Sequence, residues 1–161
     1  MNIIVAVSSN WGIGRENELL FRIKEDLARF KSLTIGKVVV MGHNTYKSIK
    51  KPLVDRVNIV LSRDETLVIP GVKMCNSLDS LREMLKAYRP EDIFIIGGEK
   101  IYARLLNECT RAYITKVDAA PPSDVFFPNL DELPEWQIVE ESEEKFQKDL
   151  RFRYCNYVFL K

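Results

Sequence analysis

The sequence has few of the residues that disulfide, metal and nucleophile chemistry require. Its three cysteines, Cys75, Cys109 and Cys155, are odd in number and far apart, so they fit neither a disulfide framework nor a zinc site. His43 is the only histidine, and no GxSxG elbow is present, so no nucleophilic triad can be assembled. The acidic stretches lack the spacing of metal ligands. We therefore expect no metal site and a reducing, cytoplasmic setting.

An excess of charge and a long apolar run are also lacking. The 24 Lys and Arg residues balance 23 Asp and Glu residues, without a basic block or stripe, so no nucleic-acid partner is expected. The apolar run at residues 3–7 has no charged segment before it and is too short for a signal core or a membrane span. We expect a soluble protein without a membrane partner.

Short runs rich in valine and isoleucine alternate with segments of helical period. The apolar runs lie at 3–7, 37–42, 57–62 and 93–98, and the helical patterns at 23–33, 44–49, 77–88 and 99–109. This alternation favours parallel strands joined by helical crossovers. After residue 110, segments 111–119, 136–144 and 152–161 follow without a convincing helix, which indicates an antiparallel edge. The sequence predicts one α/β domain over residues 1–161, with a mixed, mostly parallel central sheet flanked by helices and an antiparallel C-terminal edge.

The first expected helix carries a carboxylate on its apolar side. With about 100° per residue and Ile23 at zero, Leu27 falls at about +40°, Phe30 at about −20° and Leu33 at about −80°. Asp26 falls at about −60°, inside this apolar arc. A buried carboxylate without a partner is costly or becomes protonated, so its position needs a structural or functional reason. Asp26 is the outstanding titratable candidate for a functional site.

Three of the apolar runs end in glycine or small polar residues, in segments 42–45, 61–63 and 96–99. The carboxyl ends of parallel strands line the ligand crevice of an open α/β sheet, and glycine there lets backbone N–H groups approach a phosphate. Each glycine alone is better explained by a tight turn, but three strand ends together favour a dinucleotide. His43 and Arg63 would suit a terminal phosphate of the NADP type. The segment GIGREN, however, lacks the third glycine of a GxGxxG fingerprint.

The chain resembles the chromosomal type of dihydrofolate reductase from residue 2 to residue 160. The segments that carry the resemblance are IVAVSSNWGIGRENELL, EDLARFK, VVVMGHNTYKSI, PLVDRVNIVLSR, IFIIGGEKIY, AYITKVDA and SDVFFP. Each segment is weak alone, but their order and spacing are specific. The resemblance implies reduction of 7,8-dihydrofolate to tetrahydrofolate by hydride transfer from NADPH, which supports one-carbon metabolism and thymidylate and purine synthesis. It also implies a monomer that binds antifolate-type small molecules.

The resemblance gives Asp26 a role. The matching acid of the family binds the amino group and ring N–H of the pterin and promotes protonation at N5, and the matching threonine, Thr115, hydrogen-bonds that acid. Leu19 and Phe21 belong to the same catalytic group. A carboxylate in an apolar pocket suits bidentate recognition of an amidine-like edge. The implied substrate-binding residues are Val5, Ala6, Asp26, Leu27, Phe30, Ile49, Leu53, Thr115 and Arg56, the last as a clamp for the glutamate tail.

The cofactor implied by the resemblance is NADPH, bound across the strand ends. The Gly97-Gly98 peptide is cis in the family, a costly conformation that normally marks function. The implied cofactor-binding residues are Ala6, Ile13, Gly14, Gly42, His43, Asn44, Thr45, Leu61, Ser62, Arg63, Ile96, Gly97, Gly98, Glu99, Lys100, Ile101 and Tyr102.

Five positions depart from the family pattern. Leu20-Phe21 replaces a Pro-Trp pair in the loop over the active site, which removes an indole N–H that helps to hold an ordered water and should loosen the loop. Lys24 replaces a proline that commonly opens the helix, at small cost. His43 replaces a phosphate-binding arginine, so preference for NADPH should weaken as pH rises. Glu99 replaces a small residue, and a side chain pointing to solvent would keep its carboxylate favourable there.

Two other interpretations stay open at this stage. A reductase of the same architecture with another substrate, such as the pyrimidine reductase of riboflavin synthesis, would need neither Arg56 nor the acid in EDLARFK. A catalytically silent nucleotide-binding or interaction protein would bind the cofactor but have no affinity for pterin-like antifolates. The changed loop is the only feature that favours the second of these.

Overall fold

A nine-stranded mixed sheet forms the centre of the protein, which a computed structural model describes over residues 1–160. Lys161, the last residue of the predicted domain and of its C-terminal strand, lies outside the described residues. The strands are β1 (Asn2–Val7), β4 (Val38–Gly42), β5 (Val57–Leu61), β6 (Lys73–Cys75), β7 (Ile93–Gly97), β8 (Arg111–Val117), β10 (Trp136–Glu141), β11 (Lys145–Gln147) and β12 (Leu150–Phe159). Their order is β10-β12-β8-β1-β7-β4-β5-β6, and β11 pairs with β12.

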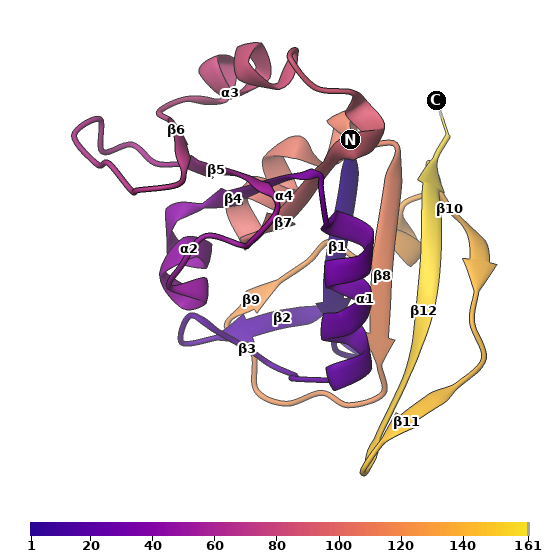
Figure 1. Ribbon diagram of the computed structural model, residues 1–161. Helices are drawn as coiled ribbons and strands as arrows, with labels where there is room; N and C mark the ends of the chain where they lie inside the picture. The colour runs from indigo at the N-terminus through magenta and orange to yellow at the C-terminus, as the bar shows by residue number, and fades with distance from the viewer. Residues whose placement is uncertain (161) are drawn as a thin grey trace.

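Parallel pairing runs from β8 through β1, β7, β4 and β5 to β6. Antiparallel pairing begins where β12 joins β8, and β10 and β11 pair with β12 at the outer side of the sheet (Figure 1). The predicted α/β class, the mostly parallel sheet and the antiparallel C-terminal edge are confirmed. The strand in segment 111–119, β8, is antiparallel on one side only. It pairs in antiparallel with β12 and in parallel with β1, which it reaches through a helical crossover.

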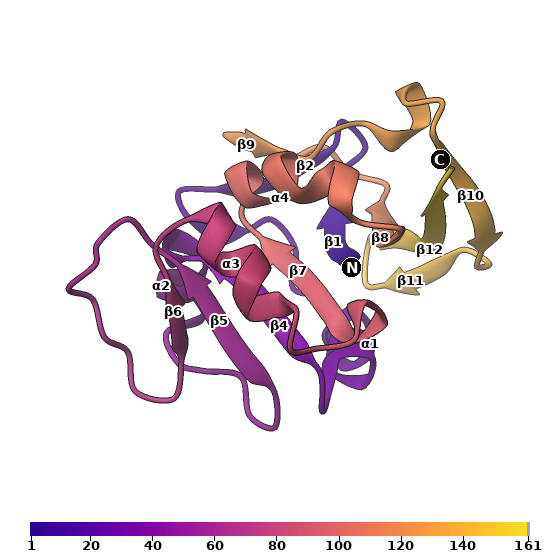
Figure 2. The same cartoon turned by 90° about the horizontal axis from the view of Figure 1, so that it is seen from above.

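Two pairs of helices cover the two faces of the sheet. Helices α1 (Lys24–Thr34) and α2 (His43–Ile49) lie on one face, and α3 (Leu78–Leu85) and α4 (Glu99–Leu105) lie on the other (Figure 2). Alternate side chains of the central strands follow this division: Ile4 and Phe30 belong to one apolar cluster, and Ile3, Leu81 and Leu105 belong to the other. The strands read as continuous apolar runs because both of their faces are buried.

The helices end earlier than the sequence pattern predicts at two places. Helix α3 ends at Leu85 rather than at residue 88, and α4 ends at Leu105, where the chain tightens into a 3-10 turn at Leu106–Glu108. Further 3-10 turns lie at Pro90–Asp92 and Leu130–Glu132. In the described part of the chain, no helix combines the length and apolar character that a membrane span requires.

A second, three-stranded sheet lies beside the carboxyl end of β1 (Figure 1). Its order is β3 (Glu18–Leu19), β2 (Gly12–Arg15), β9 (Val125–Phe126), and all its pairs are antiparallel. We call it the covering sheet. The sequence did not predict these strands, nor β6 and β11, because strands of two to four residues are too short to show an alternating pattern.

Helix α1 begins without a capping side chain of its own. Its N-cap is Ile23, and the Lys24 N–H, which a proline at this position would lack, donates to Oε1 of Gln147 at 2.7 Å. Nε2 of Gln147 donates in turn to the Arg22 carbonyl at 3.1 Å. A residue of β11 therefore fixes the start of the helix that carries Asp26.

Candidate active site

A cleft of about 1360 Å³ opens at the carboxyl ends of β1, β4, β5 and β7. Helix α1 and the covering sheet bound one part of it, and the segments that lead into α2 and α4 bound the other. Its size and apolar walls with a few converging polar groups are typical of a small-molecule site. The cleft lies where the sequence predicted ligand-binding strand ends.

Asp26 lies in the wall of this cleft and is held by a hydroxyl group from the sheet. Oγ1 of Thr115, a residue only 3% exposed, donates to Oδ1 of Asp26 at 2.6 Å. Burial raises the pKa of the Asp26 carboxyl above its ordinary value of 3.8, and the hydrogen bond from Thr115 and the positive charge of Arg29 oppose that rise. The result is a half-buried carboxyl group with one oxygen held in place, suited to bind a polar group or to influence a proton in the cleft.

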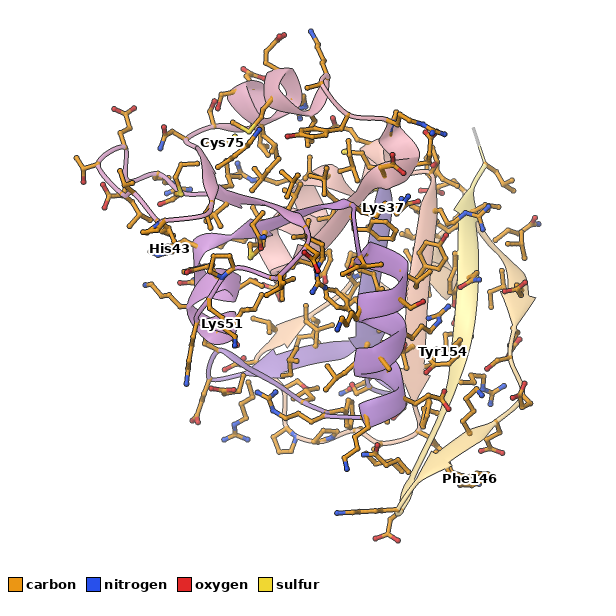
Figure 3. The ribbon with its side chains drawn as sticks, viewed as in Figure 1. Lys37, His43, Lys51, Cys75, Phe146 and Tyr154 are labelled. Carbon is orange, nitrogen blue, oxygen red and sulfur yellow. The ribbon has the colours of Figure 1, made fainter. Side chains whose placement is uncertain are left out.

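The register of three neighbouring strands explains why Asp26 finds its partner. Ala6 of β1 lies opposite Thr115 of β8, and Thr115 lies opposite Tyr154 of β12, so the three side chains form a row on the face that α1 covers. The Tyr154 hydroxyl donates to Oε2 of Glu25 at 2.7 Å, and Figure 3 shows Tyr154 between α1 and β12. The row therefore holds α1 at two consecutive residues.

Arg29 adds a cation one turn after Asp26. Its guanidinium carbon lies 4.0 Å from the ring centroid of Tyr154, and its Nη2 donates to Oδ1 of Asn156 at 3.1 Å. Both contacts come from β12, so the guanidinium is fixed between helix and sheet. Arg29 could not be recognised from the sequence, because it falls outside the apolar arc of its helix and looks like an ordinary surface residue.

Apolar side chains form the walls on either side of Asp26. Leu27 is 45% exposed and lines the cleft, in keeping with its place at the edge of the apolar arc. That face is divided, because Ile23 and Phe30 pack in clusters with the sheet while Leu27 faces open space. The walls suit a flat, largely apolar ring system. The other predicted substrate and catalytic residues that line the cleft are Val5, Ala6, Leu19, Phe21, Phe30, Ile49, Leu53 and Thr115.

The other half of the cleft has a floor with little side-chain bulk. Gly97 has φ +135°, and a Cβ there would lie 3.1 Å from Oγ1 of Thr45; a Cβ on Gly42 would lie 3.2 Å from Ile101. The Gly97-Gly98 peptide is cis, as the resemblance implied. Glycine at these positions lets Thr45 and Ile101 pack directly against the backbone of the strand ends. A wall of bare backbone suits the close approach of a phosphate, so the strand ends fit a dinucleotide. All of the predicted cofactor-binding residues line the cleft: Ala6, Ile13, Gly14, Gly42, His43, Asn44, Thr45, Leu61, Ser62, Arg63, Ile96, Gly97, Gly98, Glu99, Lys100, Ile101 and Tyr102.

Tyr102 has a structural contact as well as a place in this wall. It is 3% exposed, and its hydroxyl donates to the Ile4 carbonyl at 2.9 Å, which joins α4 to β1. Burial raises the pKa of the Tyr102 phenol, so the hydroxyl keeps its proton and remains a donor.

Arg56 is the one predicted site residue that does not line the cleft. Its Nη1 donates to Oγ1 of Thr34 at 3.0 Å, and its Nε donates to the Val54 carbonyl at 2.9 Å. Leu53, three residues earlier in the chain, does line the cleft. The role of Arg56 as a clamp stays a prediction.

Glu99 does not have the solvent-directed side chain that the sequence analysis required for a favourable carboxylate. Its Oε2 accepts a hydrogen bond from the Phe126 N–H of β9 at 2.7 Å. Asp124, which also went unnoticed, lines the cleft and accepts from the Glu16 N–H at 2.9 Å. Such contacts join residues far apart in sequence and leave no local pattern. Further lining residues that were missed are Lys47, Ser48, Lys50, Asn76, Ser77 and Arg104.

Comparisons with known proteins agree on one family. The family model described as dihydrofolate reductase matches residues 1–161. The dihydrofolate reductase type 3 of Salmonella typhimurium is 38% identical over 142 residues, which cover 88% of this chain and 86% of that protein. The dihydrofolate reductase of Bacillus subtilis (strain 168) is 34% identical over 160 residues, covering 99% of this chain and 92% of that protein.

The fold is also found in a solved structure. The dihydrofolate reductase from Enterococcus faecalis, complexed with NADP(H) and RAB-propyl, superposes with a TM-score of 0.89. The alignment covers 99% of this chain and 96% of that one, at 24% sequence identity. The central sheet, the flanking helices and the strand ends that form the cleft therefore belong to a known architecture.

Proposed function

Because the chain belongs to the dihydrofolate reductase family, we propose that its reduction of 7,8-dihydrofolate to tetrahydrofolate with NADPH depends on Asp26 as the carboxylate that promotes protonation of the substrate. The hydrogen bond between Thr115 and Asp26 at the inner end of an apolar cleft carries this proposal. Membership of this family explains the sequence better than the two other interpretations, a pyrimidine reductase of riboflavin synthesis and a silent nucleotide-binding protein.

In this account the apolar half of the cleft binds the pterin and aminobenzoyl rings. Leu27, Phe30 and Ile49 contact the faces of the rings, and their burial supplies most of the affinity. Asp26 accepts hydrogen bonds from the amino group and the ring N–H of the pterin, as a bidentate pair that fixes the orientation of the ring. Arg56 would pair with the glutamate tail.

Asp26 then acts on the proton that the product needs at N5. Its carboxyl group lies in a pocket that raises its pKa, so its negative charge is poorly solvated and favours added positive charge on the bound pterin. Thr115 donates to Oδ1 of Asp26 and fixes the orientation of the carboxylate. Each carboxylate oxygen has two lone pairs, so both oxygens can still accept from the amino group and the ring N–H. Leu19 and Phe21 limit the access of bulk water to this region.

The glycine-rich half of the cleft holds the dinucleotide. Gly97 and Gly98 let the backbone approach the pyrophosphate, and His43, Ser62 and Arg63 supply donors for a terminal phosphate. NADPH supplies the hydride when bound. Ala6, assigned to both substrate and cofactor, and Ile13, assigned to the cofactor, line the cleft and would keep the reacting rings adjacent.

The test is the loss of NADPH absorbance in the near ultraviolet after 7,8-dihydrofolate is added. We expect oxidation of NADPH, slower oxidation of NADH, and a loss of at least about hundredfold in kcat/KM for Asp26→Asn. Asp149→Asn, which changes an exposed carboxylate, is the matched control. Unchanged kcat/KM in Asp26→Asn would refute the role of the acid, and an absence of NADPH oxidation by the wild-type protein would refute the function.

The oligomeric state and the compartment are part of the same proposal. Three free cysteines are buried, and their thiols fit a reducing, cytoplasmic setting. The cleft is complete within one chain, so a monomer is sufficient for activity. Sedimentation of the active protein at the 18.7 kDa of one chain is expected, and activity confined to a larger species would contradict it.

A further inference from the structure

Glu99 joins two parts of the protein that otherwise meet mainly through apolar contacts. It is the first residue of α4, and its Oε2 accepts from the Phe126 N–H of β9 at 2.7 Å, across 27 residues of chain. Figure 2 shows β9 and β2 beside α4. An apolar contact on the same side joins the rings of Tyr102 and Phe127, whose centroids lie 5.0 Å apart.

The strand that Glu99 holds is attached in turn to the wall of the cleft. Phe126 lies opposite Gly12 in β2, and Val125 lies opposite Gly14. Gly14 pairs with Leu19 of β3, and both Gly14 and Leu19 line the cleft. The covering sheet is three short strands wide and is also held by backbone bonds from Ser8 to Gly12 and from Phe127 to Trp11. The bond from Glu99 adds a restraint at its β9 edge, on the side of α4.

A carboxylate at this position has a cost that a small side chain would avoid. Glu99 is half-buried and follows Gly98 directly, at the part of the cleft where we place the phosphates of the cofactor. Like charges in a partly buried site repel, so this carboxylate lowers the affinity for a dinucleotide. Lys100, the next residue, offsets part of that repulsion. A small residue would remove the cost, but it could not reach the Phe126 N–H.

We propose that Glu99 is a positioning residue, whose carboxylate fastens β9 to the first turn of α4 and thereby places the covering sheet over the reacting rings. The proposal rests on the proposed function, because it assigns the Gly97 and Gly98 end of the cleft to the cofactor. The charge of Glu99 weakens the binding of NADPH, and its hydrogen bond raises kcat by holding Gly14 and Leu19 in place.

Two variants separate the hydrogen bond from the charge. Glu99→Gln keeps an oxygen that accepts from Phe126 but removes the charge, and Glu99→Ala removes both. Glu132→Gln, at an exposed site far along the chain, is the control for net charge. Hydrogen exchange of the Phe126 amide is measured without ligand, the Kd of NADPH by fluorescence, and kcat and KM with 7,8-dihydrofolate.

In Glu99→Ala we expect the protection of the Phe126 amide to fall about tenfold or more, and kcat to fall several-fold. Glu99→Gln should restore most of the protection and of kcat, and bind NADPH about two- to fivefold more tightly than the wild type. Full protection of Phe126 in Glu99→Ala overturns the proposal. So does a loss of protection with unchanged kcat and KM, or a Glu99→Gln enzyme as slow as Glu99→Ala.

Failure of this inference can be told apart from failure of the proposed function. The exchange of the Phe126 amide needs neither cofactor nor substrate, and the wild-type assay reports the reaction itself. Wild-type turnover of dihydrofolate together with indifference to both Glu99 variants removes only the positioning role. Lack of NADPH binding by the wild type removes the assignment of the cleft.

Discussion

At the scale of single residues, Asp26 and Glu99 are both carboxylates whose partners come from distant strands. The position of Asp26 on the apolar side of its helix could be predicted, because the helical period is a local property of the sequence. Its partner Thr115 lies 89 residues away and was implied only by the family resemblance. Neither the helical period nor the family resemblance indicated the hydrogen bond from the Phe126 N–H to Glu99, so it was not predicted.

Replacing Asp26 should stabilise the fold at neutral pH. The folded-state pKa of Asp26 is raised by burial, so ionisation costs stability as pH rises from the ordinary value of 3.8 through the raised value. Below 3.8 the carboxyl group is protonated in both the folded and unfolded states, and the cost is absent. We expect Asp26→Asn to raise Tm by a few degrees at about pH 7, with a smaller gain at about pH 4.

The control for this prediction is Asp149→Asn, which removes an exposed carboxylate and should change Tm little at either pH. Thermal unfolding followed by circular dichroism gives the comparison. A lower Tm for Asp26→Asn at neutral pH would mean that the ionised carboxylate is a net stabilising group, in contradiction to the direction of its pKa.

Arg56 is the second residue whose role can be tested alone. Arg56→Ala should weaken the binding of dihydrofolate about tenfold, because a charge-assisted pair with the glutamate tail is lost. It should weaken a pterin without that tail far less. Fluorescence titration of both ligands measures the difference, and equal losses for the two ligands would show that Arg56 acts through its bonds to Thr34 and Val54 rather than on the tail.

At the scale of elements, the long helices and central strands could be predicted, and the short strands could not. The runs that became β1, β4, β5 and β7 are continuous and apolar because both faces are buried. Strands β2, β3 and β9 are two to four residues long and depend on pairing with one another. The start of α1 also depends on a distant element, because Gln147 of β11 caps it.

Gln147→Ala should therefore destabilise the protein by about 1 kcal/mol, the usual value of a helix cap. The Lys24 N–H loses its acceptor, and the carbonyl of Arg22 loses a donor. Urea unfolding of this variant is compared with that of Gln137→Ala, a matched change at an exposed site on β10. Equal midpoints for the two variants would show that the cap contributes nothing.

At the scale of the whole molecule, the strand order brings the functional residues together. The sheet places β1 between β7 and β8, so Ala6 lies next to Thr115 on one side and close to the Gly97 end of β7 on the other. The halves of the cleft that we propose for substrate and cofactor therefore meet at β1. Strand order depends on crossovers that join distant segments, so the pattern of strands and helices alone gave the class of the fold, while the arrangement of the site came from the family resemblance.

The pH dependence of kcat/KM in the wild type and in Asp26→Asn is the decisive test of the role proposed for Asp26. With NADPH and 7,8-dihydrofolate, we predict a deficit of at least about hundredfold for the variant near neutral pH. The deficit should shrink as pH falls, because a substrate protonated from solution no longer needs the carboxylate. A variant as active as the wild type near neutral pH, or a deficit that stays constant as pH falls, would contradict the role assigned to Asp26.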